Sequence, residues 1–362
     1  MDAAAKQALL ETPLVEAHRT AGANIGEWFG CALPSDFGDW RAEHEVARKS
    51  VALLDKNYRA YLGFTGPDRV RYLNALLTNN IKDLQPNDGI TSLFLNPQGR
   101  IQAEMETYAE AERLFCVSFA MIREKLISAL GHYIIMDDVT LTDESTKYCT
   151  LGLEGPHAAE LVRQISAIDL KSLNELSWAD GKVDGIPCRI VRRSFAGNPN
   201  AEFLCERGRL LQLWSFLREA AASRGGGPVG YTALNALRLE AGVPWFGYDF
   251  GEKQIPHEAG LEHSHISYTK GCYTGQEIVE RVRSRGQVNR VRTLFQLSVP
   301  ELPTAEAPIT FDGKEVGHVT RAAYSPEFQS NIAMGYVRRE QSVLGSTVGV
   351  GEGIATVVAP RS

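Results

Sequence analysis

The sequence lacks the features of a membrane or secreted protein. Its 362 residues contain no apolar run approaching the roughly 18 residues that a transmembrane helix needs. The first residues, MDAAAKQALLETP, have neither a basic start followed by an apolar core nor a small-residue cleavage site. Hydrophobic residues make up 44% of the chain and charged residues 23%, as in ordinary globular proteins of two or three domains. We therefore expect a cytoplasmic protein without a membrane partner.

A surplus of positive charge is also missing. The chain has 38 Lys and Arg against 44 Asp and Glu, a net charge of -6, which disfavours non-specific binding to nucleic acid. One segment differs, because ERVRSRGQVNRVR holds five arginines between Arg281 and Arg292. This strip is either a solvated strand edge or an anion-facing surface that docks an acidic partner or tRNA. The absence of GxxxxGK[ST], GxSxG and a GxGxxG after a strand argues against nucleotide-binding and hydrolase folds.

Cysteine is scarce, and its placement excludes two kinds of site. The six cysteines form no CxxC or other zinc-ligand spacing, and a chain of this size needs no disulfides. Four of them lie in apolar, strand-like runs and are predicted to be core residues: Cys116, Cys149, Cys188 and Cys205. Cys272 differs, because it lies between two glycines in a polar loop.

The chain contains a weak internal repeat. GFTGPDRVRYL (63–73) matches GLEGPHAAELV (152–162), and each predicts a strand that ends at Gly-Pro and continues into a helix. Turn signals, apolar alternation and a second helix pattern follow each copy, the helices falling at 121–130 and 209–222. This repetition predicts two related α+β units with antiparallel sheets. The predicted units span about 55–140 and 147–235.

The residue pattern of the sequence changes from about residue 290. Short β-rich runs separated by Gly, Pro and Asp predict a small all-β barrel or sandwich of about 70 residues. We therefore expect two domains, 1–288 and 289–362, with segments 1–54 and 236–288 completing the α+β units.

The segment 231–242, YTALNALRLEAG, predicts a buried helix with Thr232 as N-cap. It carries Arg238 and Glu240, and a buried unpaired charge is costly enough that each must find a partner. Residues two apart on a helix point in opposite directions and do not pair with each other. Either each has an internal ion pair, or at least one faces a ligand.

The segment KGCYTGQE, 270–277, is a candidate for thiol chemistry. Cys272 lies near the cation of Lys270 and just before a helix predicted at 276–282, and both features favour the thiolate. Gly271 and Gly275 would let the backbone approach a ligand closely. Spacing alone leaves a reactive or ligand-binding cysteine and a structural one equally open. The upstream HEAGLEHSH favours a polar loop over a metal site.

Several stretches together resemble the glycine-cleavage T-protein, the tetrahydrofolate-dependent aminomethyltransferase. The resemblance runs in the family's order through 12–48, TGPDRVRYLNALLTNNI (65–81), LGLEGPHA (151–158), ALRLEAGVPWFGYDF (236–250) and PHEAGLE (256–262). KGCYTGQEIVERVRSRGQVNR (270–290) resembles the signature of the YgfZ branch, whose folate-binding members support iron–sulfur cluster assembly and maintenance. The motif in that branch includes Lys270, Gly271, Cys272, Tyr273, Gly275, Gln276 and Glu277.

The resemblance implies a three-domain cloverleaf, two α+β units and a C-terminal β-barrel, around a channel that holds tetrahydrofolate. FAGNPNAE (195–202) matches the family segment whose glutamate binds the pterin, which gives Glu202 that role. A carboxylate suits it, because it accepts two parallel hydrogen bonds. Arg238 would clamp the folate's carboxylate tail. Further candidate folate contacts are Glu240 and the stacking aromatics Trp28, Tyr108 and Trp245.

Departures from the T-protein pattern affect the predicted chemistry. The family's paired aspartates are replaced by Ala103 and Glu104, and its DVSHMG by DKNYRAYLG (55–63). Misplacing a catalytic acid by about 1 Å costs on the order of 10²-fold in rate, so ordinary glycine cleavage is not expected. We predict a tetrahydrofolate-binding protein of the YgfZ type that acts in iron–sulfur cluster assembly or repair, with Cys272 as its working group and iron–sulfur assembly or client proteins as partners. The alternative is a folate-dependent aminomethyltransferase or demethylase that uses Glu104 as a substituted acid.

Overall fold

The computed structural model describes residues 9–195 and 198–361. Within these ranges, no helix is both long enough and apolar enough to cross a membrane. Contacts divide the chain into two units. Unit 1 comprises residues 9–61, Phe119–Arg123 and Glu144–Leu234, and unit 2 comprises Leu62–Ser118, Glu124–Asp143 and the chain from Asn235 onward.

Unit 1 is built on two sheets. The larger has the strand order β11-β12-β13-β10-β4-β14 and is antiparallel except for the parallel pair β4 and β14. Its strands are β4 (Ala52–Asp55), β10 (Tyr148–Glu154), β11 (Trp178–Val183), β12 (Ile186–Phe195), β13 (Asn198–Glu206) and β14 (Gly227–Pro228). The smaller sheet has the order β1-β3-β2, formed by β1 (Leu10–Glu11), β2 (Asn24–Trp28) and β3 (Cys31–Asp36).

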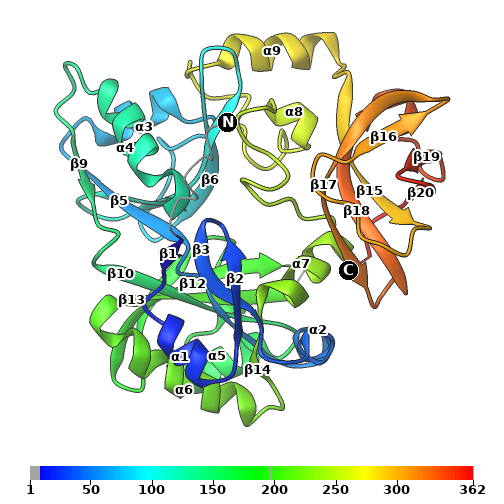
Figure 1. Ribbon diagram of the computed structural model, residues 1–362. Helices are drawn as coiled ribbons and strands as arrows, with labels where there is room; N and C mark the ends of the chain where they lie inside the picture. The colour runs from blue at the N-terminus through cyan, green and yellow to red at the C-terminus, as the bar shows by residue number, and fades with distance from the viewer. Residues whose placement is uncertain (1–8, 196–197, 362) are drawn as a thin grey trace, which may run out of the picture. The chain divides into compact units, whose positions relative to one another are not determined.

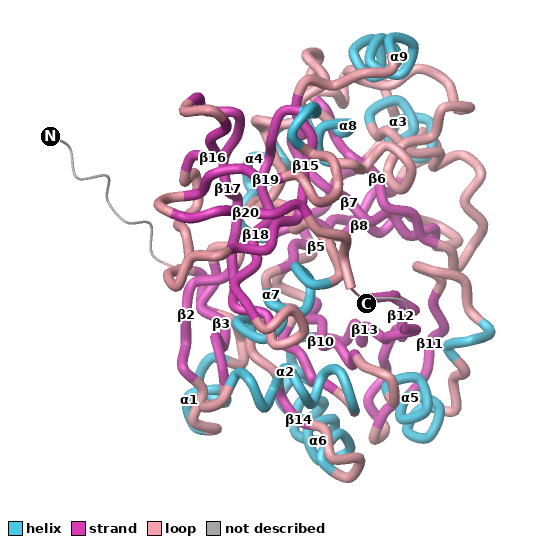
Figure 2. Tube along the Cα trace, turned by 90° about the vertical axis from the view of Figure 1, so that its right-hand side faces the viewer, coloured by secondary structure: helices cyan, strands magenta, loops and turns pink. Residues whose placement is uncertain are grey.

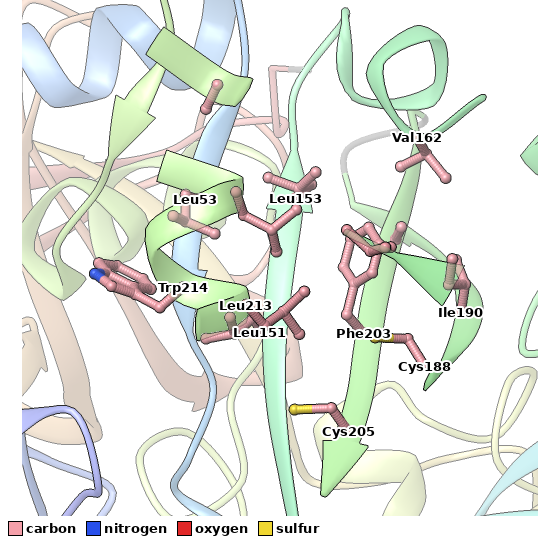
Figure 3. Close-up of a cluster of buried hydrophobic side chains, with 14 of the residues drawn as sticks. Leu53, Leu151, Leu153, Val162, Cys188, Ile190, Phe203, Cys205, Leu213 and Trp214 are labelled. Carbon is pink, nitrogen blue, oxygen red and sulfur yellow. The ribbon is translucent and has the colours of Figure 1, made fainter. Parts of the chain in front are cut away.

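One face of the six-stranded sheet forms the core of unit 1. Leu151 and Leu153 of β10 and Phe203 of β13 are fully buried there, and they pack with Leu213 and Trp214 (Figure 3). The last two lie on α6 (Leu210–Ala222), which contacts the sheet as α5 (Ala158–Ser166) does (Figure 2). Unit 1 also holds α1 (Val15–Thr20), α2 (Trp40–Lys49), η1 (Ala120–Ile122), η2 (Leu170–Ser172) and η3 (Arg207–Arg209).

Strand alternation sends polar residues to the opposite face of that sheet. Successive side chains of a strand point to opposite sides, so Gly152 and Glu154 leave the core face that Leu151 and Leu153 occupy. Glu202 of β13 pairs with Gly152 in register and joins the same polar face. The core therefore fixes where these carboxylates lie.

Unit 2 contains a five-stranded sheet with the order β6-β7-β8-β5-β9. Its strands are β5 (Arg59–Thr65, whose first residues belong to unit 1), β6 (Gly89–Leu95), β7 (Ile101–Ala109), β8 (Leu114–Phe119) and β9 (Thr140–Asp143). The helices α3 (Arg69–Leu76) and α4 (Arg123–His132) belong to this part of the chain.

The C-terminal strands of unit 2 form a closed barrel, drawn in orange to red in Figure 1. Its order is β15-β18-β17-β16-β19-β20, and Phe295, Val319 and Val337 are fully buried in its core. The strands are β15 (Arg290–Leu297), β16 (Pro308–Phe311), β17 (Lys314–Ser325), β18 (Ser330–Arg338), β19 (Thr347–Val350) and β20 (Gly353–Val357), with η4 (Arg339–Gln341) after β18.

Three helices lie before the barrel in sequence: α7 (Tyr231–Glu240), α8 (Pro256–Ala259) and α9 (Gln276–Arg285). The predicted helices at 231–242 and 276–282 are confirmed, but Thr232 is not an N-cap. Helix α7 already includes Tyr231, and the Leu234 N–H donates to the Gly230 carbonyl at 3.2 Å. The prediction of a polar loop for HEAGLEHSH is wrong in part, because it begins inside α8 and contains the buried His265.

The predicted fold class, a mixed α and β chain that ends in a β-barrel, is confirmed. Both repeat copies fold as expected, because β5 leads through Gly-Pro into α3 and β10 leads through Gly-Pro into α5. The four cysteines predicted to be core residues are buried, as is Cys31, whereas Cys272 is exposed. The domain boundary at 288/289 and the arrangement of the parts around a channel stay predictions.

Candidate functional site

Glu202 lies in a cluster of four charged groups on the polar face of unit 1. Only 2% of the residue is exposed. Arg59 donates to both of its carboxylate oxygens, Nη1 to Oε2 at 2.6 Å and Nη2 to Oε1 at 2.7 Å. Burial alone would raise its pKa, but the charges of Arg59, Lys56 and Arg193 outweigh burial and hold the pKa of Glu202 at about 2. At neutral pH, Glu202 is therefore an ionised, bidentate partner of an arginine.

Lys56 links Glu202 to a second buried carboxylate. Its Nζ lies 2.6 Å from Oε1 of Glu154 and 3.1 Å from Oε1 of Glu202. Burial lowers the pKa of Lys56, but the two carboxylates outweigh it and raise that pKa above its ordinary value. A Cβ at Gly152 would lie 2.7 Å from Cε of Lys56, so glycine leaves the space that the lysine side chain fills.

The predicted pterin contact at Glu202 is thus occupied by Arg59 in this structure. Oε1 already accepts from both Arg59 and Lys56, but Oε2 can accept a second hydrogen bond, so the role stays a prediction. Part of its family segment, residues 196–197, lies outside the described residues. The sequence interpretation did not identify the other three charged residues of this cluster, Lys56, Arg59 and Glu154. Charged residues beside the apolar strand β4 were a signal, because buried charges must be paired.

Arg238 is held inside unit 2. It is fully buried, and its Nη1 donates to Asp249, while its Nε donates to Oδ1 of Asn235 at 3.0 Å. Asp249 also accepts from the Thr320 hydroxyl of β17 at 2.6 Å. Burial lowers the pKa of Arg238, and the Asp249 carboxylate opposes this effect. These contacts agree with the alternative in which Arg238 forms an internal ion pair. They do not directly support its role as a clamp for the folate carboxylate, which stays a prediction.

One donor of Arg238 remains unused. Its Nη2 is buried and has no hydrogen-bond partner among the residues that the structure describes. Its guanidinium lies 4.8 Å from the ring of Trp245, so that ring packs on the arginine.

The remaining predicted folate contacts are also engaged in internal packing. Glu240 is fully buried and accepts a hydrogen bond of 2.5 Å from the Ser325 hydroxyl. Trp28 is 7% exposed, and its ring lies 5.6 Å from that of Tyr231. Tyr108 is 3% exposed and donates to Oε2 of Glu106 at 2.8 Å. Their stacking on a ligand stays a prediction.

Glu104 of β7 forms a carboxylate–imidazole pair. Its Oε1 lies 2.9 Å from Nε2 of His265, and the side chains are 19% and 11% exposed. Nδ1 of His265 lies 2.7 Å from the hydroxyl of Ser264. Strand alternation buries Ala103 in the core and turns Glu104 outward. The sequence interpretation missed His265, which is 161 residues away along the chain.

The loop that carries Cys272 is fixed on both sides of an exposed thiol. Lys270 Nζ donates to three backbone carbonyls at the end of α3, those of Asn74 (2.5 Å), Leu77 and Asn79 (3.1 Å). Burial lowers the pKa of Lys270 to about 8. The ammonium is thus bound to backbone carbonyls and, among the described residues, has no hydrogen bond to the Cys272 sulfur; its effect on the thiolate stays a prediction.

Gly275 fixes the other side of this loop. It caps α9 with a φ of 80°, and a Cβ there would lie 2.6 Å from the carbonyl oxygen of Asn96. Tyr273 is buried, whereas Gly271 and Glu277 are exposed and Gln276 begins α9.

The predicted arginine strip is not one continuous surface. Arg281, Arg283 and Arg290 are exposed, whereas Arg292 is half-buried. Nε of Arg292 donates to the Ala259 carbonyl at 2.8 Å, and its Nη1 donates to the Gly242 carbonyl at 2.9 Å. Within the described ranges, no group of three or more His, Cys, Asp or Glu is arranged to hold a metal ion.

A mixed α and β region followed by a closed barrel places this chain among proteins with the glycine-cleavage T-protein fold. Residues 14–266 match the family described as GCVT N-terminal domain, and residues 290–359 match the Glycine cleavage T-protein C-terminal barrel domain. The chain belongs to the glycine-cleavage T-protein family.

Relatives in this family include several aminomethyltransferases. The aminomethyltransferase of Rubrobacter xylanophilus is 30% identical over 341 residues, covering 94% of this chain and 90% of the relative. That of Desulfitobacterium hafniense is 27% identical over 343 residues, covering 94% and 93%. The crystal structure of glycine cleavage system aminomethyltransferase T from Bartonella henselae covers 97% of this chain and 96% of its own, with a TM-score of 0.87 at 24% identity. These similarities support the family as a whole, and membership of the YgfZ branch stays a prediction.

Proposed function

We propose that this protein binds tetrahydrofolate and transfers a one-carbon unit to it from an aminomethyl donor. Similarity to aminomethyltransferases over 94% of the chain supports this function. The observation that carries it is the Glu104–His265 pair, with 2.9 Å between Oε1 and Nε2. It is a carboxylate–imidazole pair at the position where the resemblance to the T-protein implies a catalytic aspartate.

Tetrahydrofolate, when bound, supplies the ring nitrogen that accepts the one-carbon unit. The polar groups of this chain fit such a ligand in two places. Glu202 has room for one more hydrogen bond at Oε2, which suits an N–H or amino group of a pterin, whereas its Oε1 already accepts from Arg59 and Lys56. The unpartnered Nη2 of Arg238 is a buried donor that suits a carboxylate.

The Glu104–His265 pair supplies the acid–base step. An amine leaving group must gain a proton as its bond to the one-carbon unit breaks, and a positioned acid lowers that barrier. The Glu104 carboxylate and the His265 imidazole share a hydrogen bond, which positions both groups for proton transfer. The exposed Ser264 hydroxyl, which lies 2.7 Å from Nδ1 of His265, connects the pair to solvent.

Glu104→Gln tests this mechanism, because it keeps the shape and removes the titrating oxygen. It should reduce the formation of methylene-tetrahydrofolate or formaldehyde from an aminomethyl donor by about 10²-fold or more, since acid–base catalysis contributes about 10²–10⁴. The matched control is Glu112→Gln, which removes an exposed carboxylate near the turn between β7 and β8. Full activity of the Glu104 variant would exclude Glu104 from the mechanism, and calorimetry with tetrahydrofolate tests binding independently of activity.

A second function, YgfZ-type support of iron–sulfur proteins, is favoured by the Cys272 loop. The thiol is exposed, and its loop is fixed by Lys270 on one side and by Gly275 on the other. A [4Fe–4S] cluster needs about four thiolates, and the other five cysteines are buried. Any cluster contact at Cys272 would therefore be shared with a partner protein or transient.

Cys272→Ser separates the two functions. If the second function is correct, this variant keeps its fold and its tetrahydrofolate affinity but fails to restore iron–sulfur enzyme activity in a strain that lacks the protein. If only the first function is correct, the serine variant restores everything that the unaltered protein restores.

A further inference from the structure

A small cavity in unit 1 is lined by three arginines. Its volume is about 120 Å³, and Arg59, Arg123 and Arg207 line it together with the polar side chains of Ser145 and Tyr148. These residues come from segments far apart in the sequence, so the cavity exists only in the folded unit.

The lining of the cavity is electropositive, although the protein is acidic. Three arginines and one glutamate, Glu11, are its charged residues, and the pairing of Arg59 with Glu202 leaves a formal charge of +1, against -6 for the whole chain. Arg59 is compensated by Glu202, but the exposed Arg207 guanidinium forms no hydrogen bond or ion pair with the residues that the structure describes. Arg207 is thus a planar donor available to a ligand.

Two cysteines also line the cavity, and the charge of the nearby Asp55 acts on both of their thiols. Cys31 and Cys149 line it, and burial raises the pKa of both thiols to about 12, so both stay neutral at physiological pH. A negatively charged ligand in the cavity therefore meets guanidinium groups, hydroxyls and neutral thiols.

The size of the cavity limits the ligand. A volume of about 120 Å³ suits a small polar group such as a phosphate or a carboxylate. Guanidinium groups bind carboxylate and phosphate oxygens through paired, charge-assisted hydrogen bonds. We propose that this cavity binds a small oxyanion, a phosphate or a carboxylate group, with Arg207 as its principal uncompensated donor.

Binding of inorganic phosphate and of glutarate, each measured by calorimetry at constant ionic strength, tests this site in the full-length protein. At least one of the two should bind saturably, and comparing them identifies the oxyanion class. Arg207→Gln should weaken that binding at least tenfold. The matched control is Arg209→Gln, which removes an exposed arginine two residues away that does not line the cavity.

Three outcomes would overturn the inference: no saturable binding of either probe, unchanged binding in Arg207→Gln, or an equal loss in Arg209→Gln. The site uses no proposed folate contact as its donor, so tetrahydrofolate binding by Arg207→Gln should equal that of the unaltered protein. The inference and the proposed function can therefore fail separately.

Discussion

Removing the charge of Glu202 should destabilise unit 1 by an amount that depends on pH. Glu202→Gln keeps the side-chain shape but leaves Arg59 and Lys56 without part of their buried countercharge. Lowering a carboxyl pKa from its ordinary 4.5 to about 2 corresponds to about 3 kcal/mol, because each unit of pKa is worth about 1.4 kcal/mol. Breaking one partner of a buried pair costs about 3–5 kcal/mol in other proteins, which agrees in magnitude.

The sign of the pH dependence follows from the lowered pKa. A carboxylate whose pKa is depressed in the folded state stabilises that state above its unfolded pKa, and the contribution is lost as pH falls toward the folded pKa. The full difference of about 3 kcal/mol between the unaltered protein and Glu202→Gln should be present at pH 7. It should shrink to about 1–1.5 kcal/mol at pH 3.

Urea unfolding followed by tryptophan fluorescence measures this difference. Four of the five tryptophans lie in unit 1, so the signal reports mainly on that unit: Trp28, Trp40, Trp178 and Trp214. Glu206→Gln, an exposed residue at the end of the same strand, is the control and should change the free energy of unfolding by less than about 0.5 kcal/mol. Equal effects of the two variants at pH 7, or a Glu202 effect that persists undiminished at pH 3, would refute the reasoning.

Two further predictions concern unit 2. Arg238→Met leaves Asp249 as a buried, unpaired carboxylate and should lower the free energy of unfolding by about 3–5 kcal/mol; thermal unfolding that matches the unaltered protein would contradict the internal ion pair. Gly275→Ala forces a side chain into a left-handed conformation 2.6 Å from the Asn96 carbonyl and should cost more than about 1 kcal/mol. Gly271→Ala, where a Cβ meets nothing within 4 Å, should be nearly neutral by the same denaturation assay, and equal effects would argue against a tightly held Cys272 loop.

Local chemistry in the sequence was enough to predict most of the elements. Apolar periodicity and Gly-Pro boundaries predicted both strand-to-helix repeats, and short β-rich runs predicted the barrel. These predictions succeeded because the signals act within about ten residues. The start of α7 was misplaced at Thr232, because the Gly230 carbonyl accepts the bond that begins the helix earlier. Element ends depend on such single contacts and are harder to predict.

The candidate sites show the same difference between local signals and tertiary contacts. The exposed Cys272 was identifiable from its polar, glycine-flanked loop, and the buried charges of Arg238 and Glu240 signalled that partners must exist. Their partners were not identifiable, because Asp249 and Ser325 reach them through tertiary packing.

The sequence by itself determined that this chain builds an α and β region followed by a β-barrel, and that charged residues are buried within its apolar elements. Only the tertiary structure decided which charges meet: Glu202 with Arg59, 143 residues away, and Glu104 with His265, 161 residues away. The physical reason is that burial makes an unpaired charge costly, which requires a partner but does not specify one. The partner is chosen by tertiary packing, which brings into contact segments that lie far apart in the sequence.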